Sequence, residues 1–265
     1  MYDVFIGAAV LVWLAGVPIA LRPMQIPLPK GIWPAYAAVP FAFFGARLFN
    51  VLLYGAGAAR LMKVDLGSFT LYGGLLLGAA AAYLLCVALR LPKRRYFDAL
   101  APVCGIGIAV SRIGCMINGC CFGLPAQLPW SVAPPYGGAA HQMQLDSGQI
   151  GTFMGLPEPP LPIHPTQAYE LIAALLAAGL AVYLIKKRVR DGIPAAAFGL
   201  SLSTLRLIIF FFRAFPGASA LSLFIRGTVT FGAAILFFGG LLYWLLKYDR
   251  RRKLASDAAH DDVLD

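Results

Sequence analysis

The chain has 265 residues, of which 60% are hydrophobic and only 13% are charged, and its mean hydropathy is +0.75. Soluble domains carry about a quarter charged residues, so this composition excludes an ordinary soluble domain and indicates an integral membrane protein. The net charge of +10 does not indicate nucleic-acid binding, because Lys and Arg stand in short blocks between apolar runs, at 93–95, 186–188 and 250–253.

Apolar runs of about 20 residues, the length that crosses the hydrocarbon core of a bilayer, predict about seven transmembrane helices. In chain order they are 3–21, 32–56, 71–91, 98–118, 165–185, 194–212 and 222–246. The predicted fold class is therefore all-α integral membrane. We expect one transmembrane domain over 1–253, with an exterior loop segment over 119–163, followed by a disordered acidic cytoplasmic tail over 254–265.

The basic residues outside the apolar runs are distributed unevenly between the two sides of the predicted bundle. Fifteen of the 22 Lys and Arg fall on the side of the C-terminus, whereas the long segment 119–163 on the other side has none. Cytoplasmic loops are the ones enriched in Lys and Arg, so we predict an exterior N-terminus and a cytoplasmic C-terminus. The first apolar run is not a cleavable signal peptide, because its positive charge follows it instead of preceding it.

Four ionisable residues lie well inside predicted spans, and a charge inside a membrane is by default a functional hypothesis. They are Arg47, Arg112, Glu170 and Arg206. Arg112 and Arg206 each lie six residues before the exterior end of a span, and Glu170 lies five residues inside the exterior start of another. At a rise of 1.5 Å per residue, all three lie about 8–10 Å below the outer surface.

These three charges sum to +1, and Arg47 would raise the sum to +2. A residual positive charge in a low-dielectric setting requires an anion, and the anion available at that depth is a phospholipid phosphate. Arginine suits phosphate because it is always protonated and can donate two parallel hydrogen bonds. The alternative is that the arginines bond backbone carbonyls and Glu170 and only lock helices together.

Two short motifs stand where predicted spans begin on the exterior side. In HPTQAYE, residues 164–170, Pro165 suits the first turn of a helix, with His164 and Thr166 at the mouth of the span and Glu170 one turn below Thr166. In LYGGLLLG, residues 71–78, the glycines permit close helix packing and Tyr72 lies at the membrane interface. Both histidine and tyrosine are also common at such positions without any function.

The five cysteines divide into two groups. Two lie within spans and are expected to be small core residues, and three stand at the exterior end of the fourth span: Cys86 and Cys104, then Cys115, Cys120 and Cys121. The exterior three allow a disulfide from Cys115 to Cys120 or Cys121, or packed thiols. They form no C-x-x-C motif, and with His164 they do not match a known zinc spacing. We therefore expect no metal and no cofactor.

The motifs together resemble a known family. SRIGCMINGCCFG, residues 111–123, resembles the arginine-glycine-asparagine signature of the bacterial prolipoprotein diacylglyceryl transferases. YGGLLLG at 72–78, HPTQAYE at 164–170 and FGLSLSTLRLIIFFFR at 198–213 resemble three further blocks of that family, and GARLFNVL at 45–52 also fits. The similarity spans about residues 40–245 and includes the seven spans in the same orientation.

The resemblance implies an enzyme of the bacterial inner membrane that uses no cofactor and has its active site toward the exterior. Its reaction would transfer a diacylglyceryl group from phosphatidylglycerol to the lipobox cysteine thiol of a prolipoprotein, bound through its signal peptide. The predicted catalytic residues are Arg112, Arg206, Tyr72, His164 and Glu170. The predicted lipid-binding residues are Arg112, Gly114, Asn118, Gly73, Gly74 and Arg47.

The chain departs from the family pattern at the positions that would activate the thiol. Tyr72 stands where the family often has histidine, Cys115 where it has asparagine, and Cys120 where it has an acidic or polar residue. Leu202 and Phe210 replace a tyrosine and a glutamate that flank the second arginine. The general base is therefore open among Tyr72, His164 and Glu170. Three alternatives also stay open: a related transferase with another acceptor or donor lipid, a non-catalytic phospholipid-binding protein, and a thiol-redox protein.

Overall fold

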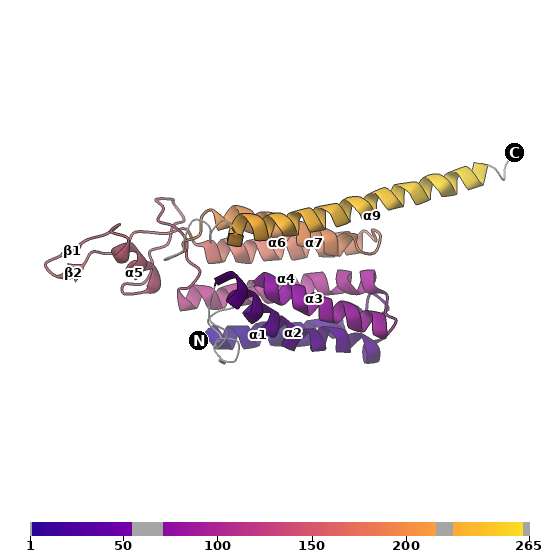
Figure 1. Ribbon diagram of the computed structural model, residues 1–265, viewed down its shortest axis with the longest axis horizontal. Helices are drawn as coiled ribbons and strands as arrows, with labels where there is room; N and C mark the ends of the chain where they lie inside the picture. Colours follow the sequence, from indigo (N-terminus) through magenta and orange to yellow (C-terminus); the bar gives the residue numbers. More distant parts are fainter. Residues whose placement is uncertain (1, 55–70, 216–224, 262–265) are drawn as a thin grey trace.

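The computed structural model describes residues 2–54, 71–215 and 225–261, and over these residues the chain folds into a bundle of long helices with a loop region at one end (Figure 1). The long helices are α1 (Tyr2–Leu21), α2 (Leu28–Tyr54), α3 (Leu71–Ala88), α4 (Lys93–Asn118), α6 (Thr166–Lys186), α7 (Ile193–Phe210) and α9 (Thr230–Asp261). A short π-helical segment, η2 (Ile225–Val229), leads into α9.

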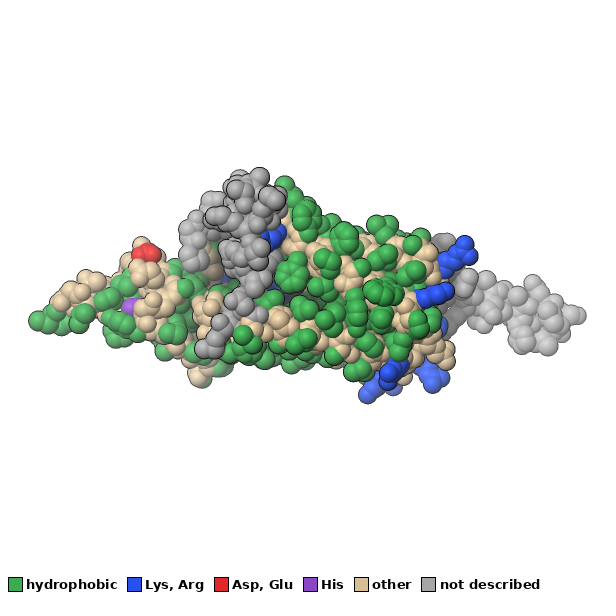
Figure 2. All heavy atoms as spheres, turned by 90° about the horizontal axis from the view of Figure 1, so that it is seen from below, with side chains coloured by type: hydrophobic (Ala, Val, Ile, Leu, Met, Phe, Trp, Pro, Cys, Tyr) green, Lys and Arg blue, Asp and Glu red, His purple; other side chains and the backbone are tan. Residues whose placement is uncertain are grey.

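The all-α membrane fold predicted from composition is confirmed. Within the described ranges, six helices are long and apolar enough to cross a membrane, and α3 supplies a shorter apolar helix. Large apolar side chains cover the sides of the bundle, as expected of a surface that faces lipid (Figure 2). The predicted span ends at 55–56 and 222–224 lie outside the described residues. Which end faces the cytoplasm remains a prediction.

Helix α4 is the central element of the bundle. It packs against α1 on one side and against α6 on the other, α7 packs between α6 and α9, and α2 packs on α3 (Figure 1). Small residues allow these helices to approach closely, as is usual where lipid provides no hydrophobic driving force. A Cβ on Gly105 of α4 would lie 2.7 Å from the Cβ of Ala178 on α6.

Many Lys and Arg side chains gather at one end of the bundle, where Figure 2 shows them around the rim. At this end Asp98 of α4 is buried and caps the start of α7. Its two carboxylate oxygens accept hydrogen bonds from the N–H groups of Gly192, at 2.6 Å, and Ala195, at 2.8 Å. The carboxylate thus satisfies donors that a helix N-terminus otherwise leaves without partners.

The opposite end carries the segment that was predicted as an exterior loop. It is not a featureless loop, because it contains helix α5 (Ala139–Asp146) and an antiparallel hairpin of β1 (Thr152–Phe153) and β2 (Leu156–Pro157). His141 of α5 is only 1% exposed. Its Nδ1 accepts a hydrogen bond from the Gly137 N–H and its Nε2 donates to the Glu158 carbonyl, both at 2.8 Å. His141 therefore holds this segment together.

Helix α9 extends further than the sequence analysis expected. The last span was predicted to end at 246 and the tail from 254 to be disordered, whereas α9 continues to Asp261. The physical reason is composition, because the chain has neither Gly nor Pro after Gly240 and is rich in Leu, Lys, Arg and Ala, which favour helix. The last residues of the predicted tail, 262–265, lie outside the described residues.

Candidate functional site

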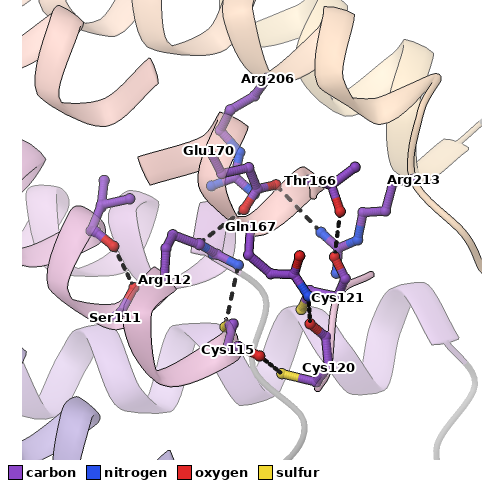
Figure 3. Close-up of polar contacts among 11 residues, drawn as sticks. Ser111, Arg112, Cys115, Cys120, Cys121, Thr166, Gln167, Glu170, Arg206 and Arg213 are labelled. Atoms are coloured by element: carbon purple, nitrogen blue, oxygen red, sulfur yellow. Dashed lines mark hydrogen bonds and ion pairs between the residues drawn. The ribbon is translucent and has the colours of Figure 1, made fainter. Parts of the chain in front are cut away.

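Three guanidinium groups, from α4, α7 and the turn after α7, meet on one carboxylate of α6 (Figure 3). Arg112 of α4 places its Nε 2.9 Å from Oε2 of Glu170 on α6. Arg206 of α7 places its Nη2 3.1 Å from Oε1 of the same carboxylate, and Arg213 places its Nη1 3.5 Å from Oε1. The structure thus brings together Arg112, Glu170 and Arg206, the three residues that the sequence predicted at one depth.

This four-residue group, which we call the arginine–glutamate centre, is largely shielded. The side chains of Arg112, Glu170 and Arg206 are 11%, 6% and 6% exposed. Three guanidinium charges and one carboxylate charge leave a formal charge of +2. Charges taken out of water are stable only when they are paired and hydrogen-bonded, and among the described residues these three guanidinium groups share the one carboxylate of Glu170.

Arg213 is the member of the centre that the sequence analysis missed, because it stood beyond the predicted end of its span and was counted as an exterior residue. In the structure α7 ends at Phe210, and the chain turns and forms a bridge between Arg213 and Gly123. The N–H of Ala214 donates to the carbonyl of Phe122 at 3.0 Å. This backbone pairing returns Arg213 to Glu170. The only sequence signal was its position seven residues, or two helical turns, after Arg206.

Tyr72 of α3 lies beside the centre, next to Arg206. Its hydroxyl is 3.3 Å from the hydroxyl oxygen of Ser203 on α7, and its ring centroid is 5.8 Å from the guanidinium carbon of Arg206. The ring of Phe231 lies at a similar distance, 5.9 Å, from the same carbon. Arg206 therefore contacts a pair of neighbouring aromatic rings and one carboxylate, and these contacts fix the direction of its remaining N–H groups.

His164 lies outside the arginine–glutamate centre, in an aromatic group at the loop end. Its ring is 5.0 Å from the ring of Phe212, and its Nδ1 is 3.4 Å from the hydroxyl oxygen of Tyr169. The exposed Trp130 donates from its Nε1 to that same hydroxyl at 2.8 Å. The structure thus puts Tyr72 against Arg206 and His164 nearer the loop region.

The predicted lipid-binding glycines have packing partners in the structure. Gly73 of α3 lies against the backbone of Gly45 on α2, and a Cβ on Gly74 would be 3.0 Å from the Ala42 carbonyl oxygen. A Cβ on Gly114 would be 2.6 Å from the Cβ of Phe5 on α1. These glycines therefore allow close helix crossings.

The remaining two predicted lipid-binding residues lie on α2 and at the end of α4. Arg47 is half-buried on α2, the helix that packs mainly on α3. Asn118 is exposed at the last residue of α4. Arg213 adds at Glu170 a positive charge that the sequence did not indicate.

The three exterior cysteines converge beside Arg112, and we call them the three-cysteine cluster. All pairs of Sγ atoms among Cys115, Cys120 and Cys121 lie within 4.8 Å, and all three thiols are free. Nη1 of Arg112 lies 3.7 Å from Sγ of Cys115. The predicted disulfide is therefore not formed in this structure, while the alternative of packed thiols agrees with it.

The backbone of the cluster is braced from α6. The Cys121 carbonyl accepts from the Thr166 hydroxyl at 2.7 Å, and the Cys120 carbonyl accepts from Nε2 of Gln167 at 2.8 Å (Figure 3). These bonds help hold Cys121 in the left-handed region, at φ 61°, which costs a non-glycine residue about 1–2 kcal/mol. Hydrogen bonds from the Cys115 and Cys120 thiols, together with the nearby Arg213 and Arg112 charges, lower the pKa of Cys121 despite its burial.

Nearly the whole chain is similar to one known protein family. The family profile for Prolipoprotein diacylglyceryl transferase matches residues 2–249. The chain belongs to this family. The match covers all four residues of the arginine–glutamate centre and the whole three-cysteine cluster.

Individual relatives carry the name phosphatidylglycerol–prolipoprotein diacylglyceryl transferase. The chain is 31% identical to the one from Bifidobacterium adolescentis over 170 residues, which are 58% of this chain and 48% of the relative. It is 25% identical to the one from Mycobacteroides abscessus over 222 residues, which are 79% of this chain and 62% of the relative. The chain thus spans about half to three-fifths of the length of these curated relatives.

Proposed function

We propose that the protein transfers the diacylglyceryl group of phosphatidylglycerol to the cysteine thiol of a prolipoprotein. Family membership supports the reaction class, and the names of the relatives supply the donor and the acceptor. The observation that carries the proposal is the arginine–glutamate centre, in which Arg112, Arg206 and Arg213 share the single carboxylate of Glu170. Its formal charge of +2 suits an anionic phosphate bound between α4 and α7.

The hydrogen-bonding capacity of the centre supports the same ligand. Among the described residues, Nε and Nη1 of Arg206 and Nε of Arg213 are buried without a hydrogen-bond partner. An unsatisfied buried donor costs about 1–3 kcal/mol, and more when it is charged. Phosphate oxygens accept several hydrogen bonds at once, and guanidinium groups match their geometry. A headgroup phosphate would therefore satisfy donors and charge together.

The reaction forms one bond and breaks one. The thiolate sulfur of the acceptor attacks the glycerol carbon that carries the phosphate ester, a C–S bond forms, and the C–O bond breaks. The electron pair of that bond goes to the phosphate oxygen, and glycerol phosphate leaves. Positive groups aimed at the leaving oxygen stabilise the charge that develops there, and we assign this role to Arg112 and Arg206, with Arg213 supporting them.

The thiol proton has to be accepted by another group. Glu170 uses both carboxylate oxygens for guanidinium groups, so we assign it the role of positioning the arginines. Tyr72 contacts Arg206 directly, whereas His164 lies nearer the loop region. We therefore propose that Tyr72, in its phenolate form, accepts the thiol proton, and that His164 is part of the path by which the acceptor reaches the reacting atoms.

The location of the site supports a membrane-exterior reaction. Arg112 and Arg206 lie near the C-terminal ends of α4 and α7, whereas the basic Lys93, Arg94 and Arg95 lie at the start of α4, and a rim of Lys and Arg faces the cytoplasm under the positive-inside rule. We propose the bacterial inner membrane, with an exterior N-terminus and loop segment, and the prolipoprotein signal peptide as the second substrate.

A direct assay tests this proposal. Purified protein in detergent receives phosphatidylglycerol labelled in its acyl chains and a lipobox peptide, and we expect the label on the peptide with one glycerol phosphate released per transfer. Arg112→Lys keeps the charge but not the paired hydrogen bonds, so we expect a loss of about 100-fold or more in kcat. Arg95→Lys is the matched control, because Arg95 forms an exposed ion pair with Asp191 at the other end.

The same assay separates the alternatives. Retention of more than a tenth of the wild-type rate by Arg112→Lys would contradict the role assigned to Arg112. A second candidate function, transfer to another acceptor, is favoured by the apolar Leu202 and Phe210 at positions where the family resemblance implies polar residues. Glycerol phosphate released without label on the peptide would support that candidate. Lipid bound in a one-to-one ratio with no release would support a binding protein.

A further inference from the structure

The three-cysteine cluster is not used by the proposed reaction, and its geometry is unusual for thiols that merely fill space. The other two cysteines, Cys86 and Cys104, lie separately on α3 and α4 and contribute to two different apolar core clusters. In contrast, Cys115, Cys120 and Cys121 direct all three Sγ atoms toward one another within 4.8 Å. Thiolates are the ligands that select soft cations such as Cu(I).

We propose that Cys115, Cys120 and Cys121 form a binding site for a soft d10 cation, with Cu(I) in three-coordination as its occupant. A metal–sulfur bond of about 2.3 Å places the three sulfurs of a planar centre about 4.0 Å apart. Because the Sγ atoms already lie within 4.8 Å, each has to move by less than about 1 Å to bind. The site therefore needs a side-chain adjustment and no refolding.

The backbone around the cluster is already held in the conformation that binding would need. The Cys120 N–H donates to the Cys115 carbonyl at 3.2 Å, which closes the end of α4 over Cys115. Thr166 and Gln167 fix the carbonyls of Cys121 and Cys120 from α6. Cys115 is 2% exposed, and the two loop cysteines are half-buried. The cluster is thus closed on the helix side and accessible from the loop side.

Charge favours a monovalent ion in three-coordination. Binding forms three metal–sulfur bonds and releases the remaining thiol protons to solvent, so Cu⁺ with three thiolates carries a net charge of −2. The adjacent arginine–glutamate centre carries a formal +2, and its Arg112 is already 3.7 Å from Sγ of Cys115. Counted over the described residues, the two formal charges are equal and opposite. A zinc ion prefers a fourth ligand, and within the described residues the group of candidate ligands contains these three thiols alone.

Direct metal binding tests the site independently of any transferase activity. The reduced full-length protein in detergent, kept without oxygen, is titrated with Cu(I) against a coloured copper chelator. We expect wild type, Cys86→Ser and Cys104→Ser each to withhold one equivalent from the chelator. Each of Cys115→Ser, Cys120→Ser and Cys121→Ser should bind at least about 100-fold more weakly, because loss of a ligand exceeds the 10–100-fold typical of an outer-shell partner.

Two measurements on the wild type avoid dependence on variants that fail to fold. X-ray absorption of the copper-loaded protein should show three sulfur ligands, and copper should protect the three cysteines, but not Cys104, from alkylation mapped by mass spectrometry. The proposal is overturned if wild type withholds no more copper than the triple serine variant. It is also overturned if the protein withholds Zn(II) and not Cu(I), or if the anaerobic reduced protein still contains a disulfide within the cluster.

Discussion

Glu170 is the residue whose removal most directly tests the arginine–glutamate centre. Glu170→Gln keeps the size of the side chain and one carbonyl oxygen, but it removes the charge that Arg112, Arg206 and Arg213 share. The formal charge of the site then rises from +2 to +3. Removing one partner of a buried ion pair costs about 3–5 kcal/mol, because the other partner stays buried and uncompensated. Since Gln still accepts one hydrogen bond, we expect the lower end, about 3 kcal/mol.

The loss is measurable as a shift in thermal unfolding in detergent. For a domain of this size, 1 kcal/mol corresponds to about 2–4 °C, so Glu170→Gln should lower the Tm by about 6–12 °C. Asp191→Asn is the matched control, because it makes the same chemical change in the exposed Arg95–Asp191 pair, whose side chains are 42% and 45% exposed. Exposed pairs contribute about 0–1 kcal/mol, which predicts a shift of less than about 4 °C.

A second readout distinguishes an anion site from a structural lock. If the excess positive charge binds lipid phosphate, phosphatidylglycerol should raise the Tm of Glu170→Gln by more than it raises that of wild type. Diacylglycerol, which lacks the phosphate, should raise neither. Equal Tm shifts for Glu170→Gln and Asp191→Asn would refute the idea that the carboxylate holds the centre together. The absence of any difference between the two lipids would refute phosphate binding there.

Three further predictions use other parts of the structure. Asp98→Ala leaves the Gly192 and Ala195 N–H groups without their acceptor, so we expect a loss of about 2–4 kcal/mol in unfolding experiments, with transfer per folded molecule unchanged. Tyr72→Phe should lower kcat in the lipid-transfer assay by about 100-fold or more with little change in KM, whereas His164→Asn should chiefly raise the KM for the peptide. Copper in the three-cysteine cluster should weaken phosphatidylglycerol binding by about 5–150-fold, as measured by equilibrium lipid binding, and the triple serine variant should not respond.

The bundle was predictable from the sequence because its physical cause is local. A run of about 20 apolar residues has to become a helix in lipid, where no water is available to satisfy the backbone. The meeting of Arg112, Glu170 and Arg206 was also indicated in advance, because counting residues to the end of each span at a fixed helical rise puts them at one level. Neither inference needs information about which helices are neighbours.

The parts that were not predictable depend on contacts between distant segments. Arg213 lies beyond the end of α7, and only the pairing of its turn with Gly123 brings it to Glu170. Asp98 stood at the expected start of a span, and nothing in its own helix indicates that it caps α7. His141 lies in the segment predicted as an exterior loop, where it is buried and bonded to two backbone groups. Such contacts are set by tertiary packing, which leaves no periodic signal in the sequence.

In the proposed reaction, the residues that bind the phosphate differ from the residues that activate the thiol. A lock between helices needs matched charges, and a single arginine opposite Glu170 would provide it; three arginines on one carboxylate exceed that requirement. In contrast, the positions where the family resemblance implies polar residues around the thiol carry Leu202, which is buried in the α4–α6–α7 core, and Cys115. In the proposed reaction, charge would bind the phosphate and proton transfer would activate the thiol, so the first can stay constant while the second changes. The acceptor and the metal response should therefore vary among such chains more readily than the donor lipid.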